Sequence, residues 1–223
     1  MQGISGFQND ELKSTEEQIS IERIELVNVI ETNLRNFNTS RSIKRITNTE
    51  NNENKYSEAF CDFMTQLAKG KFTFMREQAS GRFTVDIGVL WNSDVIFNIE
   101  AKFLPTPDSK KAKPNSKTPK RDTHEYVYKN VGINAGIERF KKCEHGRDND
   151  KKLLPENGMI AYIKEQDFDY WFDKINEWIK EAGWCYSEIL YTKYPNRDDI
   201  FISTHSRTDG SNVILHHFWV KVV

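Results

Sequence analysis

The spacing of apolar residues along the chain predicts four helices. In residues 10–36, apolar side chains recur at three- and four-residue steps, which places them on one helical face. The same stripe marks residues 55–69 and 168–182, and a glycine directly follows each of these two segments and stops the helix. Residues 123–145 are also expected to be helical, although they contain two glycines.

Elsewhere the apolar pattern has a period of two, which predicts strands. Residues 71–78, 82–91 and 94–103 are expected to form three consecutive strands of a meander, joined by Ser-Gly and Asn-Ser-Asp turns. Further strands are predicted at residues 158–163, 188–194, 199–206 and 213–222, with a hairpin over residues 208–210 between the last two.

Two polar segments interrupt this pattern. Residues 38–54 are rich in asparagine and are expected to be a linker, so we divide the chain into an N-terminal helix with its linker at 1–54 and a core domain at 55–223. Residues 104–122 hold four prolines and six basic residues, and we expect them to form a flexible basic loop.

One predicted core strand carries charge. Glu100 and Lys102 are two residues apart, so they share one face of the strand at 94–103, and the other face is apolar. Asp86 lies on the polar face of the preceding strand and can come close to Glu100. Two converging carboxylates would raise each other's pKa, and a divalent cation would remove that repulsion. Oxygen ligands without His or Cys favour Mg²⁺, with Mn²⁺ as a substitute.

The net charge of −1 conceals an uneven distribution. Between Lys102 and Lys152 there are 14 Lys and Arg residues against 7 Asp and Glu residues. This excess predicts either a basic face for a polyanion or an ordinary solvated surface.

The remaining composition excludes several classes of protein. No apolar run approaches the roughly 20 residues that span a bilayer, and the N-terminus lacks the features of a signal peptide. The three cysteines are scattered, which fits free thiols in a reducing compartment. We therefore expect a cytoplasmic protein without a membrane partner.

The stretch TVDIGVLWNSDVIFNIEAK, at residues 84–102, resembles the signature of the PD-(D/E)XK nuclease superfamily. The resemblance covers about residues 55–165. It implies an α/β (α+β) fold with a restriction-endonuclease-like core, in which helices flank a central mixed sheet. The implied order is a helix, a three-strand meander, a helix and a strand, which is the order predicted above.

By the same resemblance, Asp86 and Glu100 are metal ligands and Lys102 is the catalytic lysine. Many members of the family add a glutamate from the first core helix, and Glu58 is the candidate here. Val85 stands where the family name has a proline. For Glu58, an exposed acid near a helix N-terminus is an equal alternative.

Basic and polar residues after the lysine are candidates for phosphate contacts. Arg139 and Tyr126 belong to the segment predicted as a helix, where a core face with exposed charges is the alternative interpretation. The basic loop adds Lys110, Lys111 and Lys113, and a solvated insertion is the alternative there.

Asp/Glu-x-Lys alone is a weak motif, because it occurs five times in this chain. Only the occurrence at Glu100 follows an apolar strand and has an upstream strand aspartate. The alternative for Glu100 and Lys102 is an ion pair on the solvent face of a half-exposed sheet.

Together these observations predict a Mg²⁺-dependent endodeoxyribonuclease of a restriction, defence or mobile-element type. Its expected partner is DNA, with RNA not excluded, and it could act as a homodimer. The alternative is a non-catalytic nucleic-acid-binding or assembly protein on the same fold.

Overall fold

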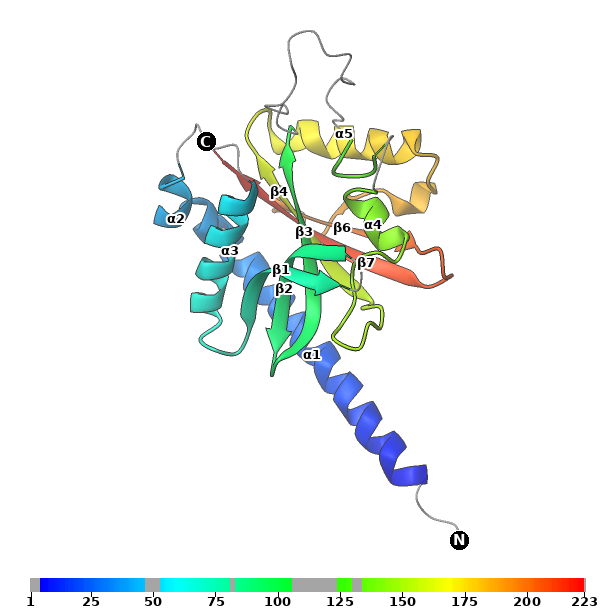
Figure 1. The fold of residues 1–223 in the computed structure, drawn as a ribbon. Helices are drawn as coiled ribbons and strands as arrows, with labels where there is room; N and C mark the ends of the chain where they lie inside the picture. The colour runs from blue at the N-terminus through cyan, green and yellow to red at the C-terminus, as the bar shows by residue number, and fades with distance from the viewer. Residues whose placement is uncertain (1–4, 47–52, 81–82, 106–123, 130–133, 223) are drawn as a thin grey trace.

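A computed structural model describes residues 5–46, 53–80, 83–105, 124–129 and 134–222 (Figure 1). In this part of the chain the fold is α/β, with one open, mixed sheet of seven strands in the order β1-β2-β3-β4-β7-β6-β5. The strands are β1 (Thr73–Ser80), β2 (Phe83–Trp91), β3 (Asp94–Leu104), β4 (Glu156–Ile163), β5 (Tyr191–Thr192), β6 (Ile200–Ser206) and β7 (Asn212–Lys221).

Helices cover both faces of this sheet, as Figure 1 shows. The N-terminal end of α1 projects away from the sheet, and its C-terminal half packs on it. The helices are α1 (Ser5–Asn38), α2 (Arg41–Lys44), α3 (Glu53–Leu67), α4 (Ile137–Lys141) and α5 (Phe168–Glu181), with a short 3₁₀ helix at Tyr186–Glu188. No helix of the described residues is long and apolar enough to cross a membrane.

The predicted meander is confirmed. β1 pairs antiparallel with β2, and β2 with β3, and Ile87 lies opposite Ile99 in that second pair. β3 then runs parallel to β4, and β4 runs parallel to β7, which makes the sheet mixed. The predicted hairpin between β6 and β7 is also present, with the turn at residues 208–210. β3 therefore lies inside the sheet, between β2 and β4.

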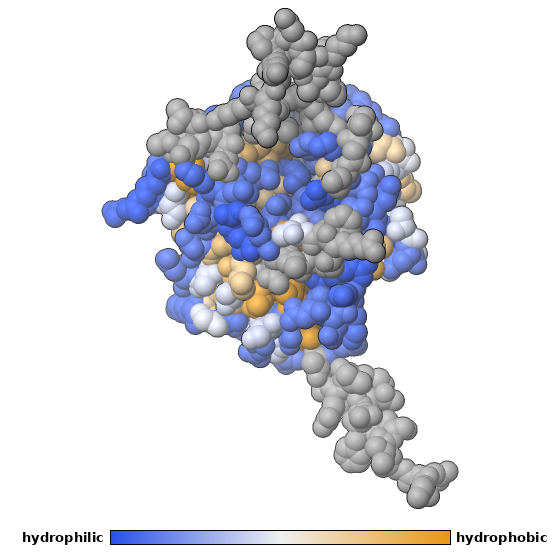
Figure 2. All heavy atoms as spheres, viewed as in Figure 1, coloured by the Kyte–Doolittle hydropathy of each residue, from blue (hydrophilic) through white to orange (hydrophobic). Residues whose placement is uncertain are grey.

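Two apolar clusters form the core, one on each face. On one face, α1 and α3 pack their stripes against the sheet, with Leu26, Ile30 and Phe60 fully buried. On the other face, α4 and α5 do the same, with Trp178 and Ile179 buried. Each such side chain contributes about 1.5–3 kcal/mol by leaving water. The outer surface on the side seen in Figure 1 is mainly hydrophilic (Figure 2).

The predicted helix at 123–145 is wrong. Among its described residues only Ile137–Lys141 are α-helical. Just before them, the backbone at Gly136 packs against the backbone of Tyr126. Gly136 has φ +52°, and a Cβ there would meet the carbonyl oxygen of Tyr126 at 1.9 Å. Because this close approach needs a glycine, the segment turns where a longer helix was expected.

Two other elements differ from the prediction. Of residues 188–194, only Tyr191 and Thr192 form a strand, which pairs with the edge of the sheet. Glu188 lies outside this strand and forms an ion pair with Lys141. The linker predicted at 38–54 contains α2, which buries Ile43 in the core.

A chain of buried polar side chains crosses the second core. The indole of Trp219 donates to the hydroxyl of Tyr126, which lies 2.8 Å from Nδ1 of His217. Ser203 Oγ lies 2.8 Å from the other ring nitrogen of His217 and 2.7 Å from His205 Nε2. Burial lowers the pKa of both histidines below the ordinary value, so both are neutral in the folded protein near pH 7.

These histidines predict a loss of stability in mild acid. The unfolded chain takes up protons below about pH 6.5, and the folded His217 does not, so the free energy of unfolding falls as the pH drops from 6.5 towards 5. His217→Gln should cost about 1–3 kcal/mol at pH 8 through its lost hydrogen bonds. It should also flatten the pH dependence, as measured by urea unfolding from pH 5 to 8. Equal slopes for both proteins in this range would contradict the assignment.

Candidate active site

Three charged side chains meet near the end of β3 that runs beside β4. The pairing of Ile87 with Ile99 brings Asp86 of β2 beside Glu100 of β3, on the same face of the sheet. Oδ2 of Asp86 accepts a hydrogen bond of 2.8 Å from the backbone N–H of Ala101. The structure thus brings together Asp86, Glu100 and Lys102, as the strand alternation predicted.

Glu100 is the most enclosed member of the group, with no exposed surface. Its Oε1 accepts from Lys102 Nζ at 2.7 Å and from an Arg139 guanidinium nitrogen at 2.9 Å. Its Oε2 lies 3.1 Å from Nδ1 of His145. Burial alone would raise the pKa of Glu100, but these three side chains outweigh it and hold the pKa below its ordinary range. The carboxylate is therefore ionised.

Lys102 lies at the centre of the group. Its side chain is 13% exposed, and its Nζ donates to Glu100 Oε1 and, at 2.6 Å, to the carbonyl of Ala101. The ammonium also lies 3.8 Å from Oδ2 of Asp86. Burial would lower the pKa of Lys102, but the surrounding carboxylates raise it above the ordinary value. The lysine is therefore protonated and acts as a counter-ion to the carboxylates.

Glu53, the first residue of α3, is a fourth member that the sequence reasoning missed. Its Oε2 accepts from the N–H of Phe103 at 3.0 Å, and its Oε1 lies 4.0 Å from Lys102 Nζ. Burial raises the pKa of Glu53 to about 7, and Asp86 and Glu100 add to this rise. The signal for Glu53 in the sequence is a carboxylate next to the first core helix, but the polar composition of residues 38–54 places it in the predicted linker.

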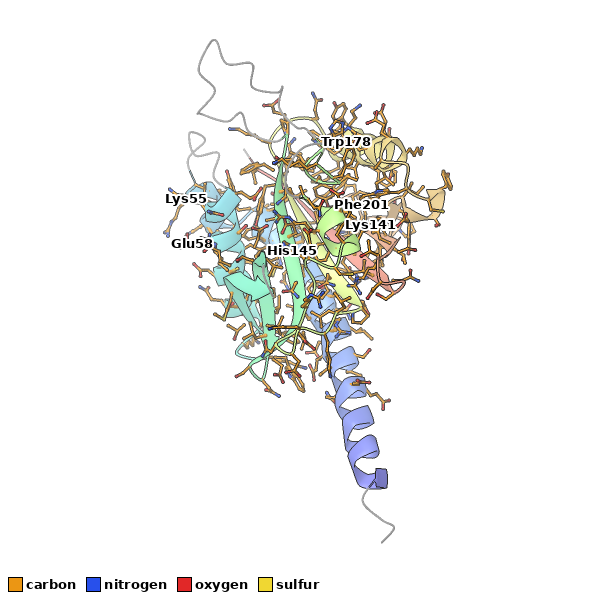
Figure 3. The ribbon with its side chains drawn as sticks, turned by 45° about the vertical axis from the view of Figure 1, so that its right-hand side comes forward. Lys55, Glu58, Lys141, His145, Trp178 and Phe201 are labelled. Carbon is orange, nitrogen blue, oxygen red and sulfur yellow. The ribbon has the colours of Figure 1, made fainter. Side chains whose placement is uncertain are left out.

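Glu58 does not reach this site, which corrects its place among the candidates. Its side chain is 63% exposed, and its nearest ion-pair partner is Arg76 at 3.9 Å. Five residues along a helix correspond to about 500°, so Glu58 and Glu53 lie on different faces of α3. In Figure 3, Glu58 lies at the periphery on α3, and His145 lies near the centre of the molecule.

The two side chains that approach Glu100 from outside the strand are held by their own contacts. Arg139 lies on α4, and its Nε donates to the carbonyl of Asn134 at 2.7 Å. The segment that carries His145 is fixed by Asn98 of β3, whose amide donates to the carbonyl of Arg147 at 2.9 Å. Arg139, predicted as a phosphate contact, thus contacts a carboxylate in this structure.

Tyr126 is not available for phosphate, which corrects a second candidate. It has no exposed surface, and its hydroxyl is used within the core by His217 and Trp219. The predicted phosphate contacts Lys110, Lys111 and Lys113 lie outside the described residues.

The alternative of a solvent-exposed ion pair does not fit the geometry of β3. Asn98 and Glu100 are both fully buried, and so is most of the opposite face of the strand. Both faces are covered because β3 lies third in the sheet, with α3 on one side and α4 on the other. Burial of this kind makes the charges costly, and the strand retains them only with full compensation.

The donor atoms around Lys102 Nζ suit a hard cation. Asp86, Glu100, Glu53 and the carbonyl of Ala101 offer oxygen only, the ligand type that Mg²⁺ and Mn²⁺ prefer. As they stand, no three His, Cys, Asp or Glu side chains among the described residues form a ready metal site. The lysine ammonium lies among these oxygens. The residues therefore fit a divalent cation in chemistry, provided that the lysine moves.

A functional assignment therefore depends on the contacts among Asp86, Glu100, Lys102 and Glu53. Comparisons of the chain with protein-family models, with curated proteins and with solved structures gave no significant match.

Proposed function

We propose that this protein is a metal-dependent DNA endonuclease of the PD-(D/E)XK type. The observation that carries the proposal is the convergence of Asp86, Glu100 and Lys102, with Glu53 beside them, at one partly enclosed point. An isolated acid-x-lysine motif is common by chance. A buried carboxylate, a second carboxylate on the neighbouring strand and a lysine that contacts both are much more specific.

The fold agrees with this proposal. In chain order, α3 precedes the β1–β3 meander, and α4 and the parallel strand β4 follow. This is the order that the resemblance to restriction-endonuclease-like proteins implies. The resemblance places the carboxylates and the lysine on the second and third meander strands, where this chain has them.

The proposed chemistry divides between a bound cation and the chain. Asp86, Glu100, Glu53 and the carbonyl of Ala101 would hold Mg²⁺ or Mn²⁺, which polarises a phosphoryl oxygen and lowers the pKa of a bound water. The chain itself contributes the Lys102 ammonium, which stabilises negative charge on the reacting phosphate. Arg139 and His145 hold the Glu100 carboxylate in a fixed orientation.

We propose DNA as the substrate because the segment around the site is basic. The excess of positive charge between Lys102 and Lys152 includes Lys151 and Lys152, which are exposed in the structure. Such charge attracts the phosphate backbone without regard to sequence. The proposal includes a cytoplasmic location. It is compatible with RNA as a substrate and with a homodimer.

The first prediction concerns cleavage itself. Supercoiled plasmid incubated with the protein and Mg²⁺ should be nicked or linearised, and Mn²⁺ should substitute, whereas EDTA should stop the reaction. Lys102→Ala should reduce the rate by roughly 10²- to 10³-fold, because the reacting phosphate loses the positive charge that the chain supplies. Gel electrophoresis of the plasmid over time gives both rates.

Two results would overturn parts of this proposal. Cleavage that persists at the wild-type rate in Lys102→Ala would refute the role of the lysine. If no DNA or RNA is cut with any divalent metal, and the folded protein still binds nucleic acid, the non-catalytic binding protein becomes the better interpretation.

The second prediction uses two glutamates of the same helix. Glu53→Gln should lower the cleavage rate by about tenfold or more, because Glu53 is a proposed cation ligand and its Oε1 lies 4.0 Å from Lys102 Nζ. Glu58→Gln is the matched control, and it should leave the rate within about twofold of wild type, because its carboxylate is exposed on another face. The opposite order of effects would show that the site uses Glu58.

A further inference from the structure

The ammonium of Lys102 lies at the point where the carboxylates of the site converge. Its Nζ is 2.7 Å from Glu100 Oε1, 3.8 Å from Asp86 Oδ2 and 4.0 Å from Glu53 Oε1. The same nitrogen is 2.6 Å from the carbonyl oxygen of Ala101. These are the oxygens that would surround a divalent cation. A cation and this ammonium therefore cannot occupy the centre of the group together.

We propose that Lys102 is a built-in counter-ion of the site that a divalent cation displaces. In the metal-free protein the lysine neutralises the carboxylate group and keeps it folded. When the cation enters, the ammonium leaves the group, and its charge becomes available to an anionic substrate. This inference rests on the metal site of the proposed function, and it adds an exchange between two cations.

The carboxylates of Asp86 and Glu53 can keep their positions during this exchange, because each also accepts a hydrogen bond from the backbone. Asp86 accepts from the N–H of Ala101, and Glu53 accepts from the N–H of Phe103. Both donors belong to the backbone of β3, so they remain when the lysine moves. The positions of the two carboxylates therefore do not depend on Lys102.

Glu100 is secured in another way. It has no exposed surface, so if Lys102 were its only partner, departure of the lysine would leave a buried, uncompensated charge. Arg139 contacts Oε1 at 2.9 Å, and His145 Nδ1 lies 3.1 Å from Oε2. Each comes from outside β3. These two contacts keep Glu100 compensated when Lys102 leaves, which the acid-x-lysine motif alone could not do.

A static role for Lys102 makes a different prediction. If the lysine only anchored Glu100, its removal would loosen the carboxylates and weaken metal binding. If it is exchanged, its removal deletes a competitor and strengthens metal binding. The sign of the change in affinity therefore separates the two roles.

The experiment is calorimetric titration of Mn²⁺ into the full-length protein, without nucleic acid. Lys102→Met should bind Mn²⁺ at least about tenfold more tightly than wild type. Lys141→Met is the matched control, because it removes an equal charge from another buried carboxylate, that of Glu188. Glu188 is not among the proposed metal ligands, and this variant should stay within about threefold of wild type.

The proposal is overturned if Lys102→Met binds Mn²⁺ no more tightly than wild type, or if the control Lys141→Met gains as much. Should Lys102→Met be unfolded without metal, recovery of its native circular dichroism on addition of Mn²⁺ would support the exchange, and failure to recover would overturn it. The cleavage assay keeps the two proposals separate. Tighter binding by Lys102→Met, together with an inactive wild type, would refute the nuclease and leave the exchange standing.

Discussion

The arrangement of the site depends on the burial of one carboxylate, that of Glu100. An ionised carboxylate without exposed surface costs several kcal/mol unless charged or polar groups surround it. The chain supplies these groups from three places: Lys102 from the same strand, Arg139 from α4 and His145 from the segment that follows α4. Glu100 thereby connects the sheet to α4 and to the irregular segment that follows it. These contacts set the positions of the side chains around Glu100.

This requirement explains features that would otherwise look unrelated. Gly136 allows the chain to cross Tyr126 closely, and α4 begins at the next residue and carries Arg139 towards the sheet. Asn98, two residues before Glu100 on the same face, binds the carbonyl of Arg147 and so fixes the segment that bears His145. Both residues contribute to the site through the chain that they position. Neither belongs to the motif of acids and lysine.

The sequence predicts those parts of the structure that depend on local periodicity. Alternation along β2 and β3 correctly placed Asp86, Glu100 and Lys102 on one face, because the side chains of a strand follow a strict period of two. The errors concern residues whose position depends on distant contacts. Glu53 was missed because its role depends on where the start of α3 meets the end of β3. The helix predicted at 123–145 failed because the tertiary crossing at Gly136 outweighs helix periodicity.

The charges of the site also explain how it can fold without a bound cation. Asp86, Glu100 and Glu53 converge, but Lys102 and Arg139 bring two positive charges to them. A cluster of carboxylates alone would repel itself and would need a cation to fold. The positive charges of Lys102 and Arg139 remove that need. Removal of either charge would leave the carboxylates less fully compensated and would lower the stability of the fold. Under the proposed exchange, the site would favour a divalent ion, because only an ion with more charge than an ammonium gains enough from the same oxygens to take its place.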